Sequence, residues 1–210
     1  MPIRLARSDE AELLGAVLAD ALGEDPIFRW LIPASPRRDR RLLRFFTAMS
    51  SAYLDAGKSA YLAEDDAGAA LWAGPGTTWR MQFDLRQLRA VLASFGARWV
   101  VRGVRTQGQL ASLHPRDPHW YLGFLGVRGS QQNRGLGGAL LAEVLRKADD
   151  ERMSAYVESS NRRNLPFYER HGFEIVEEIR LLGNGPDVWR LWRSAPGSQT
   201  AGRSTRLPST

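Results

Sequence analysis

Apolar residues along this chain recur in two patterns, and each pattern predicts one type of secondary structure. Positions spaced three or four apart predict amphipathic helices, as in Leu42, Phe45, Phe46, Met49 and Tyr53. Short apolar runs bounded by turn residues predict strands. The helical pattern covers residues near 9–22, 36–56, 83–113, 136–145 and 166–171. The strand pattern covers residues near 3–5, 59–63, 69–73, 119–127, 154–158, 173–181 and 187–192.

The distribution of apolar residues predicts one domain followed by a tail. A chain of 210 residues is long enough to bury a full hydrophobic core, and the predicted elements run without a repeat to residue 193. From residue 194 on, seven of the seventeen residues are serine or threonine, and Leu207 is the only large apolar side chain. A segment this poor in apolar residues cannot bury enough surface to fold. We therefore expect a domain over residues 1–193 and a disordered tail over residues 194–210.

Composition excludes several classes of protein. The chain has no cysteine, which rules out disulfides, iron–sulfur clusters and a cysteine nucleophile. His114, His119 and His171 are scattered without a metal-ligand spacing, so we expect them to be structural or on the surface and expect no metal site. No run approaches the ~18 consecutive apolar residues of a membrane span, and the first residues do not resemble a signal peptide. A cytoplasmic protein that does not bind membranes is expected.

The basic net charge bears on nucleic-acid binding. The formal charge is +6, and every basic residue except Lys58 and Lys147 is arginine or histidine. The densest cluster of arginines, over residues 37–44, is interrupted by Asp39. Such a cluster is typical of a solvated helix face, and no known nucleic-acid-binding motif accompanies it. We expect no nucleic-acid partner.

The segment most informative about chemistry is residues 131–140, QQNRGLGGAL. It follows a predicted strand and opens a predicted helix, so its backbone N–H groups lack partners within the helix and can bind phosphate groups. A Walker loop would need lysine and serine or threonine after Gly138, where Ala139 and Leu140 stand. A dinucleotide-binding loop would need glycine at position 140, and too few residues follow for the remaining strands of a Rossmann sheet.

A third kind of phosphate loop fits this segment better. Gln132, Gly135 and Gly137 fill the fixed positions of Q/R-x-x-G-x-G/A, and the segment resembles the acyl-CoA loop of the GNAT superfamily of N-acyltransferases. Residues 161–173, NRRNLPFYERHGF, resemble a second segment of that family, N-x-x-x-x-x-L/F-Y-E-x-x-G-F, at the expected distance downstream. Within the superfamily, the chain most resembles puromycin N-acetyltransferase-like enzymes.

The resemblance implies a fold and a co-substrate. The fold would be a mixed α/β, three-layer one, with a mostly antiparallel twisted sheet, one splayed pair of parallel strands and helices on both faces. Acetyl-CoA would bind without a metal, its pantetheine lying in the splay along the backbone of the first parallel strand. The Val127 N–H would then stabilise the oxyanion of a tetrahedral intermediate. The acetyl-CoA-binding residues implied are Leu125, Gly126, Val127, Gln132, Asn133, Arg134, Gly135, Leu136, Gly137, Gly138, Asn161 and Asn164.

Several of these residues also have purely structural interpretations. Leu125 and Val127 would fill core positions with their side chains while their backbone contacts the ligand. Asn161 and Asn164 would either bond the pantetheine amides or cap the loop and helix that follow. These alternatives stay open at the level of sequence.

Two residues are candidates for the chemistry. By resemblance, Tyr168 is the general acid that protonates the departing CoA thiolate, unless its ring only fills the core. A free tyrosine has a pKa near 10 and a thiol near 8.5, so this proton transfer is uphill by ~1.5 pH units unless the site lowers the tyrosine pKa. Otherwise the hydroxyl would only hydrogen-bond the sulfur. Glu158, at the end of a strand beside the splay, is the candidate general base, acting through a water, although a glutamate there can also be merely solvated.

The acceptor is the part of the reaction on which the sequence is least informative. The resemblance suggests the amino group of a small, partly aromatic molecule, attacked directly by acetyl transfer. Alternatives are a protein lysine or N-terminal acetyltransferase, or a non-catalytic acetyl-CoA sensor. The protein is expected to be a monomer or a homodimer, and the apolar segment 25–33 is expected to form a lip. Candidate residues for an aromatic acceptor pocket are Phe28, Trp30, Trp72, Trp79 and Phe83.

Overall fold

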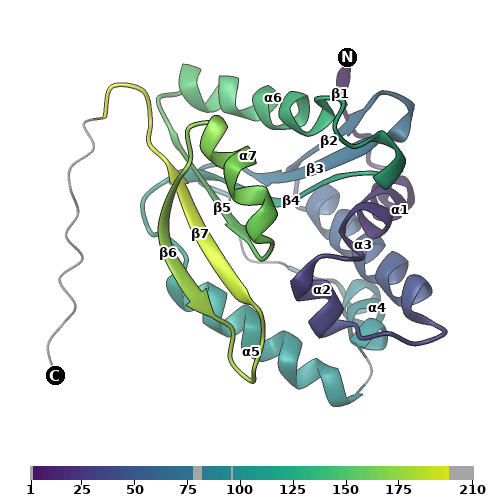
Figure 1. The fold of residues 1–210 in the computed structure, drawn as a ribbon. Coiled ribbons are helices and arrows are strands. Elements are labelled where there is room, and N and C mark those ends of the chain that lie inside the picture. The colour runs from purple at the N-terminus through teal and green to yellow at the C-terminus, as the bar shows by residue number, and fades with distance from the viewer. Residues whose placement is uncertain (1, 78–81, 96, 199–210) are drawn as a thin grey trace, which may run out of the picture.

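The computed structural model describes residues 2–77, 82–95 and 97–198. In this part of the chain, seven strands form one sheet in the order β1-β2-β3-β4-β5-β7-β6 (Figure 1). The strands are β1 (Ile3–Leu5), β2 (Ser59–Ala63), β3 (Gly68–Ala73), β4 (His119–Val127), β5 (Ser154–Ser159), β6 (Glu174–Arg180) and β7 (Asp187–Arg193). Each lies close to a run that the hydrophobic pattern predicts as a strand.

The helices of the described residues also follow the predicted pattern, with one addition. They are α1 (Ala11–Leu22), α2 (Pro26–Leu31), α3 (Arg38–Asp55), α4 (Leu85–Phe95), α5 (Ala97–Leu113), α6 (Leu136–Asp150) and α7 (Leu165–Arg170). Short 3-10 turns are η1 (Glu64–Asp66), η2 (Gly129–Gln131) and η3 (Arg162–Asn164). The addition is α2, which the sequence analysis treats only as a turn-rich lip.

Helices cover both faces of the sheet, as the resemblance implies. Successive residues of a strand point to opposite faces, and β2 and β3 distribute their side chains accordingly. Leu62 and Leu71 belong to the core shared with α1, α3 and α4, whereas Tyr61 and Trp72 belong to the core shared with α6 and α7. Figure 1 shows α6 and α7 on one side of the sheet and α1 and α3 on the other. The predicted fold class is confirmed.

The sheet is antiparallel except where β4 and β5 run side by side. These two strands pair only from His119 with Ser154 to Leu122 with Val157. Beyond that point β4 continues to Val127 along β3, while β5 ends at Ser159 beside β7. The two strands therefore part at their carboxyl ends, which confirms the predicted splay.

An irregularity in β4 lies next to the point where the strands part. The register between β3 and β4 shifts between Leu71 and Trp72, which leaves Gly123 as the extra residue of a β-bulge. A Cβ at Gly123 would lie 2.0 Å from the Tyr53 hydroxyl oxygen. Glycine at this position therefore lets Tyr53 of α3 reach the backbone of the bulge.

Two features of the described residues bear on the predicted tail and on membranes. The last strand ends at Arg193, and the Ala195 N–H donates to the Ser154 hydroxyl oxygen over 3.2 Å. Residues 199–210 of the predicted tail lie outside the described part of the chain, so the tail stays a prediction. No helix in the described part combines the length and hydropathy that crossing a bilayer requires.

Candidate active site

The open edge of β4 is the first component of the site. The Arg128 N–H donates to the Ala67 carbonyl of the β3 side over 2.8 Å. Because backbone groups of a strand alternate between its two edges, Gly126 also faces β3, whereas Leu125 and Val127 face the splay. The register of β3 and β4 agrees with this assignment. The N–H and C=O groups of Leu125 and Val127 are thus directed to the side where β5 no longer pairs.

Gly126 contributes to this edge through its packing. A Cβ there would lie 2.6 Å from the Cβ of Ala21 in α1. Glycine therefore lets α1 lie directly on the strand, and the residue has a structural role in addition to the ligand contact predicted for it.

The loop between β4 and α6 is the second component. Gly135 has φ 81°, directly before the first residue of α6, Leu136, and Asn133 has φ 62°. The left-handed turn brings the chain into the helix with its first N–H groups exposed at the splay end of the sheet. A Cβ on Gly135 would meet nothing within 4 Å, so the backbone conformation, rather than space, requires glycine here. Leu136 is buried.

Side chains of the loop form hydrogen bonds to the end of β4 and within the loop. The Gln132 amide nitrogen donates to the Val127 carbonyl over 3.1 Å, and an Arg134 guanidinium nitrogen donates to the Gln131 side-chain oxygen over 2.5 Å. Gln132 thereby ties the loop to the open edge of β4. This edge and the phosphate-type loop form one continuous surface.

Gly137 of the motif and Gly138, which follows it, face α7 and the residue after it. A Cβ on Gly137 would lie 3.6 Å from the Phe167 ring, and one on Gly138 would lie 3.3 Å from His171 Nε2. Both positions therefore let α7 approach α6. Their roles in the fold add to the phosphate contact predicted for them.

The two asparagines after β5 differ in their contacts. The Asn161 side-chain oxygen accepts from the Arg163 N–H over 3.1 Å and caps η3. The Asn164 side chain makes no hydrogen bond within the described part of the chain, and it lines a cavity. Of the two, Asn164 is the one that lines the cavity.

Tyr168 is buried and lines the same cavity. Its ring packs against Phe167 and Phe173, with centroids 5.1 and 5.8 Å apart. Its hydroxyl has no hydrogen-bond partner among the described residues. Burial, and secondarily the Asp25 carboxylate, raises the Tyr168 pKa well above its ordinary value. This is opposite to the lowering that direct proton donation to a thiolate requires, so the hydroxyl stays protonated near neutral pH.

Glu158 is held by two tyrosines. Tyr121 donates to its Oε2 over 3.0 Å, and Tyr156 donates to its Oε1 over 2.9 Å. Arg190 donates in turn to the Tyr156 hydroxyl oxygen over 3.0 Å. Burial raises the pKa of Glu158, although both hydrogen bonds and the Arg190 charge act in the other direction. The carboxylate is therefore a positioned side chain with increased basicity rather than a freely solvated strand end.

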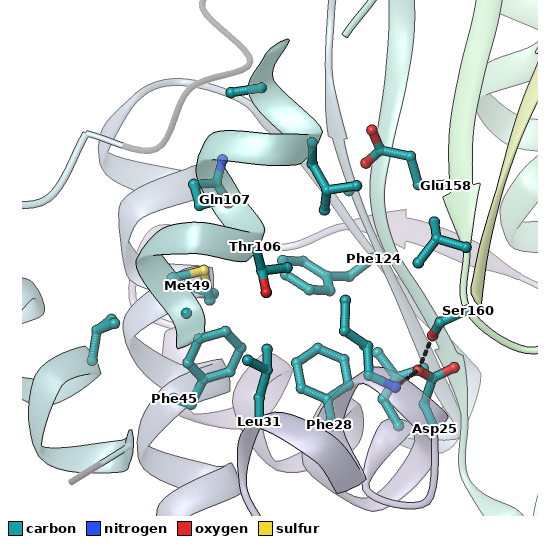
Figure 2. Close-up of a pocket in the computed structure, with 18 of the residues that line it drawn as sticks. Asp25, Phe28, Leu31, Phe45, Met49, Thr106, Gln107, Phe124, Glu158 and Ser160 are labelled. Atoms are coloured by element: carbon teal, nitrogen blue, oxygen red, sulfur yellow. Dashed lines mark hydrogen bonds between the residues drawn. The ribbon is translucent and has the colours of Figure 1, made fainter. Parts of the chain in front are cut away.

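A cavity of about 570 Å³ is lined by Leu125, Glu158, Asn164 and Tyr168, among other residues. It extends from the splay, at Leu125, to the helices α2, α3, α4 and α5. Figure 2 shows Glu158 and Ser160 of the β5 end facing Thr106 and Gln107 of α5 across it. Most of its lining is apolar, with aromatic rings from Phe28, Phe45 and Phe124.

The predicted aromatic pocket is only partly correct. Phe28 and Phe83 line the cavity, but Trp30 and Trp72 do not. Trp72 points to the opposite face of the sheet and is fully buried beneath α6, because its position in β3 alternates with Leu71. Trp79 lies outside the described residues.

Asp25 is a cavity residue that the sequence analysis missed. Its Oδ1 caps α2 by accepting from the Ile27 N–H over 3.1 Å, and it also accepts a hydrogen bond from the Ser160 hydroxyl (Figure 2). Burial raises its pKa. The Asp-Pro pair at positions 25 and 26 is a helix-start signal, but no local pattern indicates that the end of β5 lies beside it.

The histidines lie away from this cavity. His114 and His119 are both buried, with their Nε2 atoms 3.2 Å apart. Burial lowers both pKa values, that of His114 to about 3, so both rings are neutral. The His171 Nδ1 lies 2.8 Å from the Phe167 carbonyl oxygen. The described residues contain no cluster of three or more side chains that could hold a metal.

The chain is similar in sequence to known acetyltransferases. The model of the acetyltransferase (GNAT) family matches residues 79–173. An uncharacterized N-acetyltransferase of Schizosaccharomyces pombe is 27% identical over 199 residues, which are 90% of this chain and 80% of that protein. Over these segments the chain is therefore similar to GNAT acetyltransferases.

Solved structures extend the comparison to the fold. A structure of histone acetyltransferase HPA2 and related acetyltransferase from Corynebacterium glutamicum is 25% identical, with a TM-score of 0.68 over 94% of this chain and 97% of that one. The structure of yncA from Salmonella typhimurium, solved with acetyl-CoA, is 16% identical, with a TM-score of 0.56 over 95% of this chain and 96% of that one. Acetyl-CoA-dependent acetyl transfer is general to this family.

Proposed function

We propose that this protein transfers the acetyl group of acetyl-CoA to the amino group of a small-molecule acceptor. The observation that carries this proposal is the continuity of the open β4 edge, the loop at Gly135 and the cavity that holds Glu158 and Tyr168. The volume of the cavity, about 570 Å³, is within the range of small-molecule sites. This favours a small acceptor over a protein lysine or N-terminus.

The acetyl-CoA side of the proposal rests mainly on backbone groups. We assign the phosphates to the N–H groups of residues 132–138, where the start of α6 favours anions. Leu125 and Val127 are assigned to the pantetheine, because their backbone groups face the splay. Asn164 is assigned to a pantetheine amide, since its side chain lines the cavity without a protein partner.

We assign the chemistry to three groups: Glu158 and Tyr168, which line the cavity, and the Val127 N–H on the open edge of β4. Bound acetyl-CoA supplies an acetyl group activated as a thioester. Glu158 takes the proton that the acceptor nitrogen loses, directly or through a water, as that nitrogen bonds the acetyl carbon. The Val127 N–H faces the splay and stabilises the negative charge that develops on the acetyl oxygen. Tyr168 donates a hydrogen bond to the sulfur as the carbon–sulfur bond breaks.

One experiment separates this proposal from its alternatives. The protein is incubated with acetyl-CoA and a panel of small amines, lysine-containing peptides and peptides with free N-termini, and products are identified by mass spectrometry. We expect a small amine that gains one acetyl group with stoichiometric release of CoA. Acetylation of peptides alone would favour the protein acetyltransferase alternative. Tight acetyl-CoA binding without any product across the panel would favour the sensor.

A further inference from the structure

Arg190 of β7 lies in the same row of the sheet as Glu158. The strand register pairs Glu158 of β5 with Arg190, and Arg190 with Glu177 of β6. Residues directly opposite each other in a sheet share a face, and Tyr156, two positions before Glu158, lies on that face as well. Glu158 lines the cavity, whereas Tyr156 and Arg190 do not. The guanidinium therefore acts on the carboxylate from outside the cavity.

The guanidinium of Arg190 is held by three separate contacts. Its Nε donates to the Tyr156 hydroxyl oxygen over 3.0 Å, its Nη1 donates to the Glu177 carboxylate, and its Nη2 donates to the carbonyl of Leu113, the last residue of α5. A guanidinium presents its donors in one rigid plane, so these three acceptors fix its orientation. Only 16% of the side chain is exposed, so water screens its charge poorly.

The contact between Arg190 and Tyr156 determines where the tyrosine directs its proton. A guanidinium has donors and no acceptor, so the Tyr156 oxygen accepts from Arg190, and its own O–H donates to the Glu158 Oε1 over 2.9 Å. Without Arg190, the same oxygen is free to accept a hydrogen bond from a protonated Glu158. Arg190 thus favours the arrangement in which Glu158 accepts, which is the arrangement of its ionised form.

The charge of Arg190 acts in the same direction as this hydrogen bond. Removal from water disfavours an ionised carboxylate, and burial accordingly raises the pKa of Glu158. The hydrogen bonds from Tyr156 and Tyr121 and the positive charge of Arg190 oppose this rise in pKa. Because the role proposed for Glu158 is to accept a proton, this opposition keeps more of it in the competent form near neutral pH.

The other titratable groups that the structure describes beside Glu158 are neutral near pH 7, because burial raises the pKa of the tyrosines and lowers that of the histidine. They are Tyr53 of α3, Tyr121 of β4, Tyr156 of β5 and His114, which follows α5 and packs on the last two tyrosines. Across the cavity, α5 presents the uncharged Thr106 and Gln107 (Figure 2). Asp25 of α2 is hydrogen-bonded to Ser160. The guanidinium of β7 therefore supplies the positive charge of this network.

We propose that Arg190 is a positioning residue for Glu158. It orients the Tyr156 hydroxyl toward the carboxylate and holds that carboxylate in its ionised form, ready to take the proton of the acceptor amine. The inference rests on the proposed acetyl transfer, since Glu158 is a base only in that reaction. Because Arg190 also bonds the Leu113 carbonyl, one side chain fixes both the base and the end of α5, a helix that lines the cavity.

A titration of Glu158 tests the inference without any substrate. Protein labelled with ¹³C at the glutamate carboxyl carbon is followed by NMR against pH, and the Glu158 signal is assigned by its absence in Glu158→Gln. We expect its titration midpoint to lie at higher pH in Arg190→Met, so that the ionised fraction on the acidic side falls about tenfold. The Kd for acetyl-CoA should not change. An unchanged midpoint in folded Arg190→Met would refute the inference.

Two further variants separate positioning from structural support. Tyr156→Phe leaves the contacts of Arg190 with Leu113 and Glu177 in place, and the midpoint should again move to higher pH. This variant decides the question if Arg190→Met does not fold, and an unmoved midpoint in it would overturn the inference. Arg190→Lys keeps the charge and should return the midpoint toward the wild-type value. The matched control is Arg180→Met, which removes an exposed guanidinium at the end of β6 and should leave the midpoint unchanged.

Acetyl transfer to 2-phenylethylamine, whose ring is suited to the apolar lining of the cavity, links this titration to the reaction. We expect kcat/KM in Arg190→Met to fall about tenfold on the acidic limb of its pH profile and to approach the wild-type value at alkaline pH. An equal loss at every pH would indicate a structural defect and contradict the inference. A moved midpoint without acetyl transfer to any amine would support positioning by Arg190 and refute the proposed function. Acetyl transfer with an unmoved midpoint would refute the inference alone.

Discussion

The acetyl-CoA side of the site and the acceptor cavity are built in different ways. The acetyl-CoA side comprises the β4 edge, residues 132–138 and residues 161–164, and presents mainly backbone groups set by strand alternation and by Gly135. The acceptor cavity is lined by residues from six helices and three strands of the described chain, many of them far apart in the sequence. A co-substrate is thus held by local conformation, and acceptor choice depends on residues that only tertiary packing brings together.

This difference predicts which measured quantity each substitution changes. Substitutions on the acetyl-CoA side should change the affinity for acetyl-CoA. Substitutions in the cavity should change kcat or the KM of the amine. The following predictions test this division, from the largest expected effect to the smallest.

Glu158→Gln should have the largest effect. The amide fills the same space and still hydrogen-bonds Tyr121 and Tyr156, but it cannot accept the proton. We expect kcat/KM for the amine to fall by ~10²–10⁴-fold at neutral pH, with an unchanged Kd for acetyl-CoA. The control is Glu174→Gln, an exposed residue of β6, which should leave kcat/KM unchanged. Loss of acetyl-CoA affinity in Glu158→Gln would break the proposed division of the site.

Tyr168→Phe should reduce kcat by about 10²-fold. The ring and its packing against Phe173 remain, so the Kd for acetyl-CoA should change little. Because its pKa is raised, Tyr168 should stay a neutral hydroxyl up to pH 10. Ionisation of Tyr168 should therefore cause no loss of wild-type activity between pH 8 and 10. Near-normal kcat in Tyr168→Phe would exclude it from the chemistry. The control is Tyr61→Phe. In the wild-type protein the Tyr61 hydroxyl accepts a hydrogen bond from Lys147 Nζ in the core beneath α6.

Gly135→Val should weaken acetyl-CoA binding by about tenfold. A β-branched residue is disfavoured at φ 81° by ~1–2 kcal/mol, and relief of that strain would distort the loop. Calorimetry measures the Kd, and circular dichroism checks the fold. Gly129→Ala is the matched control in the same loop, because φ there is not positive and a Cβ would meet nothing. An unchanged Kd in folded Gly135→Val would contradict the assignment of the loop.

Tyr121→Phe should shift the pH profile and produce the smallest effect. Glu158 must be ionised to accept a proton, so kcat/KM should rise with pH through its pKa. The substitution removes a hydrogen bond to the charged form, which raises that pKa further and moves the acidic limb to higher pH. We expect about a fivefold loss on that limb, equivalent to ~1 kcal/mol for a lost hydrogen bond, and a smaller loss at alkaline pH. A uniform loss at every pH would indicate a packing defect instead.

Local features of the sequence predicted most of the fold. The runs at 119–127 and 154–158 are predicted as strands because they are apolar and bounded by turn residues, and Gly135 and Gly172 mark conformations that glycine favours. The spacing of motifs around these positions also produced the resemblance to GNAT N-acyltransferases. The sequence did not identify α2 as a helix, because its apolar pattern spans only six residues, too short for a periodicity to be recognised.

What the sequence by itself determined is therefore the backbone framework: the strands, the helix starts and the loop of the acetyl-CoA side. These depend on residues that are neighbours in the chain. The tertiary structure alone decided that Asp25 meets Ser160, that Tyr121 and Tyr156 hold Glu158, and that Trp72 lies on the face opposite the cavity. Each of these contacts depends on strand register, on the bulge at Gly123 or on helix packing. Such features are fixed by the burial of side chains from distant segments, which no local pattern of residues specifies.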